Sequence, residues 1–267
     1  MSLILKDRLT GTPLFRRTAV AAALVVAAAS ASALPQFTLD PSASGLAGTS
    51  FTGDNILISD FSAVTFDGLG NFTDTGFLSV SAIQLGGGTF TPPGLNTDYG
   101  LYFAFTGSGT TTVGDPTLVP TIGTFTSLTF TLYGYNGLAS FGFAGNTPTE
   151  TAVGEVALAT GTLISGNAVT VPTGDGSTFT PSAAAKMTFT VAPGQTAFFV
   201  DPKPFYNVTF AAFTNTTSQV EPFAGGFRIR QGGGAVNFAT AVPEPETYAL
   251  MLAGLAAVGF IARRRSA

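Results

Sequence analysis

A two-residue alternation of apolar with small or hydroxylated side chains recurs along the chain and constrains its fold more than any other feature. In Phe125–Tyr133, for example, Leu128 and Phe130 alternate with threonines, and Phe77–Ile83 and Tyr206–Phe213 show the same period. Successive side chains of a strand point to opposite faces, so each of these segments has one apolar face. Frequent glycine and proline exclude long helices between them. The pattern therefore predicts an all-β fold of antiparallel sheets packed face to face.

Further segments combine β-branched and aromatic residues in the manner of strands, and turns rich in Gly, Pro and Asn separate them. The expected strands are Asn55–Ile58, Ala63–Phe66, Gly76–Gln84, Gly100–Thr106, Phe125–Tyr135, Ala139–Phe143, Glu155–Leu163, Ala168–Val171, Lys186–Val191, Thr196–Val200, Tyr206–Thr214, Gly226–Arg230 and Ala235–Phe238. The expected turns include Leu85–Gly88, Pro92–Asn96, Gly134–Gly137, Ser165–Asn167, Gly174–Gly176 and Gly232–Gly234. We expect one jelly-roll-like antiparallel β-sandwich over residues 34–238, with a division into two smaller sandwiches at Pro116–Pro120 as the alternative.

Missing residue types narrow the chemistry that the chain can perform. It contains no Cys and no His, which excludes disulfides, cysteine nucleophiles, the commonest general base and the commonest transition-metal ligand. The segment Leu34–Val242 carries twelve acidic side chains against four basic ones, Lys186, Lys203, Arg228 and Arg230. Because this segment is strongly acidic, we expect no nucleic-acid partner.

The first 33 residues have the organisation of a signal peptide. Basic residues between Lys6 and Arg17 precede the apolar stretch Thr18–Ala29. Ala31-Ser32-Ala33 then supplies a small-residue cleavage site. We therefore expect an N-terminal signal helix, export of the protein, and a mature chain that begins at Leu34.

The C-terminal residues form a second export signal. Val242-Pro243-Glu244-Pro245 precedes the uncharged, apolar segment Thr247–Ala262, and Arg263-Arg264-Arg265 follows that segment. As a transmembrane helix, the apolar segment would be about 24 Å long, slightly short for a hydrocarbon core of about 30 Å. The prolines keep residues 239–246 extended as a linker. The arginines retain residues 263–267 in the cytoplasm as a basic tail.

This tail resembles the PEP-CTERM sorting signal of Gram-negative bacteria. The resemblance implies recognition by a membrane-embedded exosortase, transient anchoring in the inner membrane, and removal of the tail near Pro243–Glu246. Delivery to the cell surface or to the extracellular polymer would follow. A plain single-span membrane anchor is the alternative interpretation of the same residues.

The mature segment contains no motif that identifies a catalytic residue. Paired carboxylates can hydrolyse glycosides without His or Cys. The candidates for such a pair are Asp60, Asp67, Asp74, Glu150 and Glu155. Their spacing places them at loops and strand ends and predicts solvated surface acids. We expect no catalytic residue, no metal ligand and no cofactor. Calcium bound by the oxygen-rich loops Asp54–Asp60 or Gly174–Gly176 is the alternative.

Tyr133 and Tyr135 are the candidates for stacking against a glycan. They flank Gly134 and precede Asn136-Gly137, and a flexible turn there would let both rings reach solvent. The alternative is that these rings simply belong to the hairpin turn and bind nothing.

A second resemblance covers the body of the chain. Asp54–Asp60, Gly76–Ala82, Asn96–Phe103 and Gly225–Arg230 leading into Asn237-Phe238 are similar to segments of the flocculation-associated PEP-CTERM proteins. That family implies a secreted structural protein that associates with exopolysaccharide and helps cells to aggregate in flocs or biofilms. We therefore expect an extracellular matrix or surface protein that binds exopolysaccharide or itself. An exported carboxylate-dependent enzyme that degrades polysaccharide is the alternative.

Overall fold

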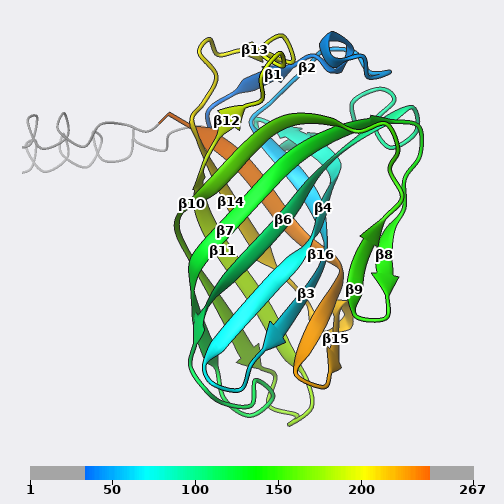
Figure 1. The fold of residues 1–267 in the computed structure, drawn as a ribbon. Helices are drawn as coiled ribbons and strands as arrows, with labels where there is room; N and C mark the ends of the chain where they lie inside the picture. The colour runs from blue at the N-terminus through cyan, green and yellow to red at the C-terminus, as the bar shows by residue number, and fades with distance from the viewer. Residues whose placement is uncertain (1–33, 241–267) are drawn as a thin grey trace, which may run out of the picture. The chain divides into compact units, whose positions relative to one another are not determined.

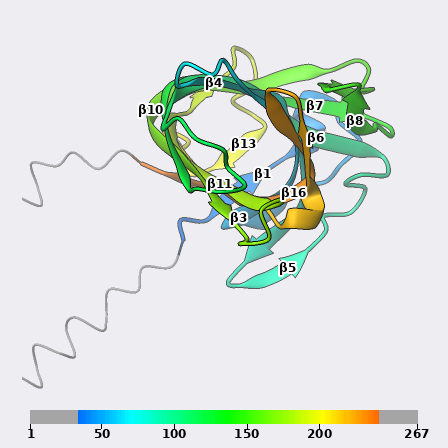
Figure 2. The same cartoon turned by 90° about the horizontal axis from the view of Figure 1, so that it is seen from below.

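The computed structural model describes residues 34–240, which fold almost entirely into antiparallel strands (Figure 1). The all-β, antiparallel prediction is confirmed, but the jelly-roll-like sandwich is wrong. Eight long strands close into a barrel, in which the last strand of the spatial order pairs with the first. In that order they are β11 (Phe179–Thr188), β14 (Val208–Thr214), β16 (Gly226–Ala239), β3 (Asn55–Phe66), β4 (Asn71–Leu85), β6 (Tyr99–Thr111), β7 (Thr121–Asn136) and β10 (Val156–Pro172). Figure 2 shows them as a ring around the barrel interior.

Several segments that we expected to be turns belong to long continuous strands. These long strands can close into a barrel. The glycine run Gly232–Gly234, which we expected to be a turn, belongs to β16. The register of β16 against β3 shifts between Arg230 and Gly232, and Gln231 between them has a φ of 53°. A Cβ on Gly232 would lie 2.1 Å from Asn215 Oδ1, so only glycine fits there. Bulges and glycines of this kind bend a strand without ending it, so one sheet can curl and close.

The alternation in the sequence matches the two surfaces of the barrel. Ile56 and Ile58 on β3, and Leu78 and Val80 on β4, point inward and are buried. Their neighbours in sequence face outward. The expected boundary Pro116–Pro120 lies in the loop between β6 and β7, which pair with each other along most of their length. It therefore does not separate two sandwiches.

A small sheet and its flanking segments cover the upper end of the barrel in Figure 1. The sheet consists of β13 (Phe199–Asp201), β1 (Phe37–Leu39) and β2 (Phe51–Gly53), and a 3-10 helix, η1 (Pro41–Ser44), follows β1. Phe37 contacts Phe238 edge-on at 5.2 Å between ring centroids, and Phe189 contacts Phe199 at 5.5 Å. These aromatic contacts join the small sheet to the end of the barrel.

Short strands extend the barrel sheet at its ends. They are β5 (Gly88–Phe90) on β4, β12 (Thr190–Val191) on β10 and β15 (Val220–Phe223) on β16. A second 3-10 helix, η2 (Thr217–Gln219), precedes β15. Within residues 34–240, no helix is long and apolar enough to cross a membrane.

A hairpin of β8 (Phe141–Ala144) and β9 (Thr147–Glu150) packs on the outside of the barrel. Phe141 contacts Phe61 on β3 and Tyr102 on β6, with ring centroids 5.9 and 5.4 Å apart. Arg228 on β16 donates a hydrogen bond to the main-chain oxygen of Gly145 at the hairpin tip. The hairpin therefore covers part of the outer face instead of extending the barrel sheet (Figure 1).

Candidate functional site

The barrel interior contains a cavity lined largely by aromatic rings and small apolar side chains. Phe72 packs edge-on against Phe125, and Phe179 packs edge-on against Phe227. The ring of Phe130 contacts Phe103 and Phe189. Most of these rings line the cavity, which has a volume of about 110 Å³.

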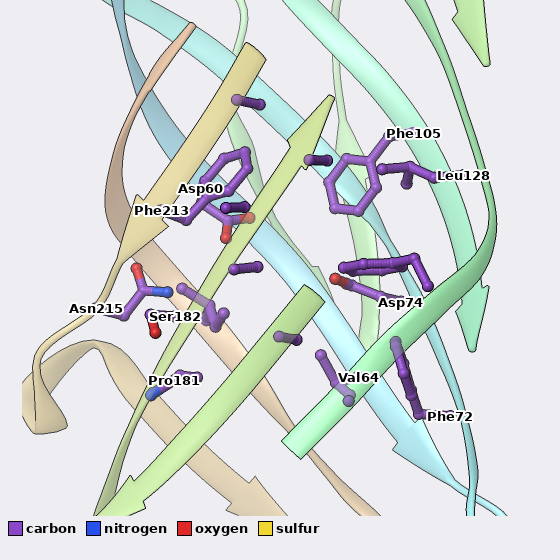
Figure 3. Close-up of a pocket in the computed structure, with 18 of the residues that line it drawn as sticks. Asp60, Val64, Phe72, Asp74, Phe105, Leu128, Pro181, Ser182, Phe213 and Asn215 are labelled. Atoms are coloured by element: carbon purple, nitrogen blue, oxygen red, sulfur yellow. The ribbon is translucent and has the colours of Figure 1, made fainter. Parts of the chain in front are cut away.

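Small side chains on one wall leave this space open. Ala168 on β10, Ala183 and Ala185 on β11, and Ala211 on β14 all line the cavity. The opposite wall carries larger side chains, including Phe105 and Leu128 (Figure 3). The space exists because alanine on three adjacent strands faces phenylalanine and leucine across the barrel.

Two carboxyl groups point into this apolar space. Asp60 on β3 and Asp74 on β4 both line the cavity (Figure 3). Asp60 is only 4% exposed, and the Oδ1 atoms of both residues are buried without a hydrogen-bond partner. Burial raises the pKa of Asp60 to about 7. Burial raises the pKa of Asp74 well above its usual range, and the negative charge of Asp60 raises it further.

This arrangement corrects the expectation that all five candidate acids are solvated and lie apart. Asp60 and Asp74 converge inside the barrel, although they are fourteen positions apart in the sequence. The signal that could have identified them was the alternation itself. Each occupies an inward position of its strand, Asp60 between Ile58 and Ser62 and Asp74 between Phe72 and Gly76. An acid in the apolar phase of an alternating strand indicates a buried polar group.

The other three candidate acids have local structural partners. Asp67 accepts hydrogen bonds from the side-chain amide and the main-chain N–H of Asn71 and from the main-chain N–H of Leu69, and these bonds lower its pKa. Glu150 accepts a hydrogen bond from the main-chain N–H of Ala152. Glu155 accepts one from the hydroxyl of Tyr102. None of these three lines the cavity.

Asn215 was not among the expected site residues, yet it adds a third side chain with an unpartnered oxygen at the cavity. It lies just after β14, is 2% exposed, and its Oδ1 is buried without a partner (Figure 3). Thr121 and Thr170, also at the cavity wall, share a hydrogen bond across β7 and β10. Among the residues that line the cavity, the unpartnered side-chain atoms therefore belong to Asn215 and the two acids, whereas Thr121 and Thr170 bond each other.

The two tyrosines expected to stack against a glycan lie in different environments. Tyr135 is 2% exposed, and a Cβ on Gly100 would lie only 2.2 Å from its ring, so this tyrosine does not lie on an exposed turn. Tyr133 is partly buried on β7 and stacks on Tyr102 at 5.3 Å. Only Tyr133 presents part of its ring to solvent, and its role in glycan binding stays a prediction.

Of the two segments considered for calcium, Asp54–Asp60 belongs mostly to β3, and Gly174–Gly176 lies in a loop whose acid bonds its own neighbours. Asp54 accepts a hydrogen bond from the N–H of Gly86. Asp175 accepts bonds from Thr173, Ser177 and Thr178, and these bonds lower its pKa. Within residues 34–240, no three acidic side chains lie close enough together to hold a metal ion.

The sorting-signal and cleavage residues lie almost wholly outside the described residues. Ala31 and Ala33 precede that range, Leu34 is its first residue, and Val242–Pro245 and Arg263–Arg265 follow it. The comparisons with known proteins bear on the C-terminal part. Residues 241–265 match the PEP-CTERM protein-sorting motif. No curated protein and no solved structure matches the chain.

A chain with this motif is an exported protein whose C-terminus directs its sorting. The protein is a PEP-CTERM protein. The motif implies export to the cell surface through a membrane-anchored intermediate, with an exosortase as the processing enzyme. The resemblance of the body to flocculation-associated proteins stays a prediction.

Proposed function

We propose that this exported protein promotes cell aggregation by binding exopolysaccharide at the cell surface or in the extracellular matrix, and that it does not cleave the polymer. The observation that carries the proposal is the location of the acids that converge. Asp60 and Asp74 line a cavity of about 110 Å³. For comparison, an apolar cavity of about 150 Å³ holds one benzene molecule. A polysaccharide chain does not fit between these carboxyl groups, so the geometry does not favour glycoside hydrolysis.

Barrel closure favours glycan binding over association through strand edges. An edge strand recruits another chain through its unpaired N–H and C=O groups, and closure pairs both edges of each barrel strand. The strands outside the barrel are two to four residues long. The outer face is therefore the larger binding surface.

A groove on this outer face has the chemistry to bind a neutral glycan. It has a volume of about 460 Å³ and lies between the outer side of β4, β6 and β7 and residues of β9. Thr75, Thr106 and Thr129 are direct cross-strand neighbours, and Thr131 and Thr147 add two more hydroxyl groups to its lining. Each hydroxyl can donate and accept hydrogen bonds. No charged side chain lines the groove.

The proposal can be tested in the source bacterium by gene deletion and complementation. We expect deletion to reduce cell aggregation and the wild-type gene to restore it. A Thr106→Arg/Thr129→Arg variant should fail to restore aggregation, because two long cationic side chains would fill the groove. Thr214→Arg is the matched control, since Thr214 is an exposed residue on β14, outside the groove.

Two results would contradict the proposed function. One is normal aggregation, and normal retention of the protein in the extracellular polymer, for the groove variant. The other is release of sugar from the polymer by the wild-type protein that is lost in Asp60→Asn/Asp74→Asn. The second result would establish the enzyme instead.

A further inference from the structure

The cavity contains two acids and no basic group. Asp60 and Asp74 are the only titratable side chains among the residues that line it, which come from all eight barrel strands. The four basic residues of the described chain lie elsewhere. Arg228 and Arg230 pair with Glu221 and lie over Phe143 outside the barrel. Lys186 lies over the ring of Phe210, and Lys203 is exposed.

Polar atoms without a hydrogen-bond partner at nearly full burial point to a ligand that would supply the partner. A buried polar group without a hydrogen bond costs free energy, and a buried carboxylate costs more. Asp60 and Asn215 are at most 4% exposed, and each has an unpartnered side-chain oxygen at the cavity. These oxygens accept hydrogen bonds, so the complementary ligand group is a donor, and next to two carboxyl groups it is a cationic donor.

We propose that the barrel interior binds a small apolar molecule carrying one primary amine, with its ammonium group hydrogen-bonded to the carboxyl oxygens of Asp60 and Asp74. The apolar part of the ligand packs against Ala168, Ala185 and Ala211 and the facing phenylalanine rings. A volume of about 110 Å³, smaller than the cavity of about 150 Å³ that holds benzene, limits that part to a short alkyl chain. This binding site is distinct from the threonine-lined outer groove.

Proton linkage gives the site a recognisable pH dependence. Without ligand, burial raises the pKa of both acids, that of Asp60 to about 7, so the free Asp60 is largely protonated at pH 5. An ammonium group stabilises the carboxylate form, so binding releases a proton wherever the free acid is protonated. The affinity for the amine should therefore rise with pH below about 7, by up to about tenfold per pH unit for one proton released. An uncharged ligand of the same shape should bind equally well at each pH.

The test is an NMR titration of the exported protein with n-propylamine and with n-propanol, its uncharged counterpart. We expect n-propylamine to bind at least about tenfold more tightly than n-propanol at pH 8, and its affinity to fall as the pH decreases to 5. Asp60→Asn/Asp74→Asn should lose this preference and still bind n-propanol. Asp115→Asn, which changes an exposed loop acid, should bind both ligands like the wild type.

Ala185→Leu tests whether the ligands bind inside the barrel. Leucine would fill the cavity and should weaken the binding of both ligands. Circular dichroism of each variant checks that the strands are retained. The proposal fails if n-propanol binds the wild type as tightly as n-propylamine, or if Asp60→Asn/Asp74→Asn retains the preference for the amine. It also fails if the folded wild type binds neither ligand.

Discussion

Asp60 and Asp74 lie on neighbouring strands and face the same cavity, although neither is opposite the other. The register of β3 against β4 places Asp60 opposite Leu78 and Asp74 opposite Val64. Each carboxyl group therefore has an apolar cross-strand neighbour, and the electrostatic repulsion between the two acids acts across the cavity. The fold holds two carboxyl groups in an apolar interior without a basic partner among the cavity-lining residues.

The first prediction is that stability falls as the pH rises from 5 to 8. An acid whose pKa is raised by folding binds more protons in the folded state than in the unfolded one, so the free energy of unfolding decreases as pH rises between the two pKa values. For Asp60 this range runs from about 4 to about 7. One pKa unit corresponds to about 1.4 kcal/mol, so the loss should be a few kcal/mol. Denaturant unfolding at several pH values measures it.

The absence of His and Cys makes this measurement specific, because few other groups titrate between pH 5 and 8. Asp60→Asn/Asp74→Asn should remove most of the pH dependence and stabilise the protein at pH 8. Asp115→Asn is the control, since hydrogen bonds from Thr117 lower the pKa of that exposed acid. An unchanged pH dependence in the double variant would contradict the prediction.

The second prediction concerns the attachment of the β8–β9 hairpin to the barrel. Arg228 pairs with Glu221 at 2.5 Å, bonds the main chain of Gly145 and lies over the ring of Phe143. Arg228→Ala should cost about 1–3 kcal/mol, the range for hydrogen bonds to charged groups. The same change should expose the hairpin to proteases. Limited proteolysis and denaturant unfolding measure the two effects.

Arg230→Ala is the matched control. Arg230 also pairs with Glu221 and lies over Phe143, but its side chain is 49% exposed. Within residues 34–240, it donates no hydrogen bond to the main chain of the hairpin. A surface ion pair of this kind contributes about 0–1 kcal/mol. Equal losses of stability for the two variants would show that Arg228 does not hold the hairpin.

The sequence predicted the strands better than their arrangement, for a physical reason. Alternation depends on each segment alone, so at least part of each barrel strand lay in an expected segment, whereas the short strands β5, β9 and β15 did not. Sandwich and barrel share this local pattern, and the difference lies in whether strands end or bend at their glycines. Gly232–Gly234 continues a strand at a place where Asn215, which lies just after β14, packs against Gly232. That long-range contact has no local signature.

The candidate site shows the same division. Asp60 and Asp74 occupy inward positions that the alternation defines, so their burial was predictable from single strands. Their convergence was not, because it depends on how β3 and β4 pair and on the alanines of β10, β11 and β14. The burial of Tyr135 follows from Gly100 on the adjacent strand, which leaves room for its ring.

The third prediction is that Gly161→Ala strongly destabilises the barrel. Gly161 on β10 pairs with Phe130 on β7. A Cβ there would lie 2.2 Å from Phe130 Cε1 and 2.2 Å from the main-chain oxygen of Thr188. Overpacking of this kind typically costs about 1–3 kcal/mol. Gly142→Ala on β8 is the control, because its added methyl group would meet no atom within 4 Å. Similar unfolding curves for the two variants would contradict the packing at Gly161.

The fourth prediction is that the extracellular protein begins at Leu34 and lacks the C-terminal basic cluster. The PEP-CTERM motif at residues 241–265 implies exosortase processing, and Pro243-Glu244-Pro245 precedes an apolar segment of marginal length for a permanent anchor. Cleavage near Pro243–Glu246 would remove Arg263–Arg265. Intact-mass spectrometry of protein from the culture medium measures both ends.

Pro243→Ala/Pro245→Ala should reduce release and leave the protein with the membrane fraction. Pro92→Ala/Pro93→Ala, in an internal loop, is the control and should be released normally. Extracellular protein that retains Arg263–Arg265 would contradict processing at this site.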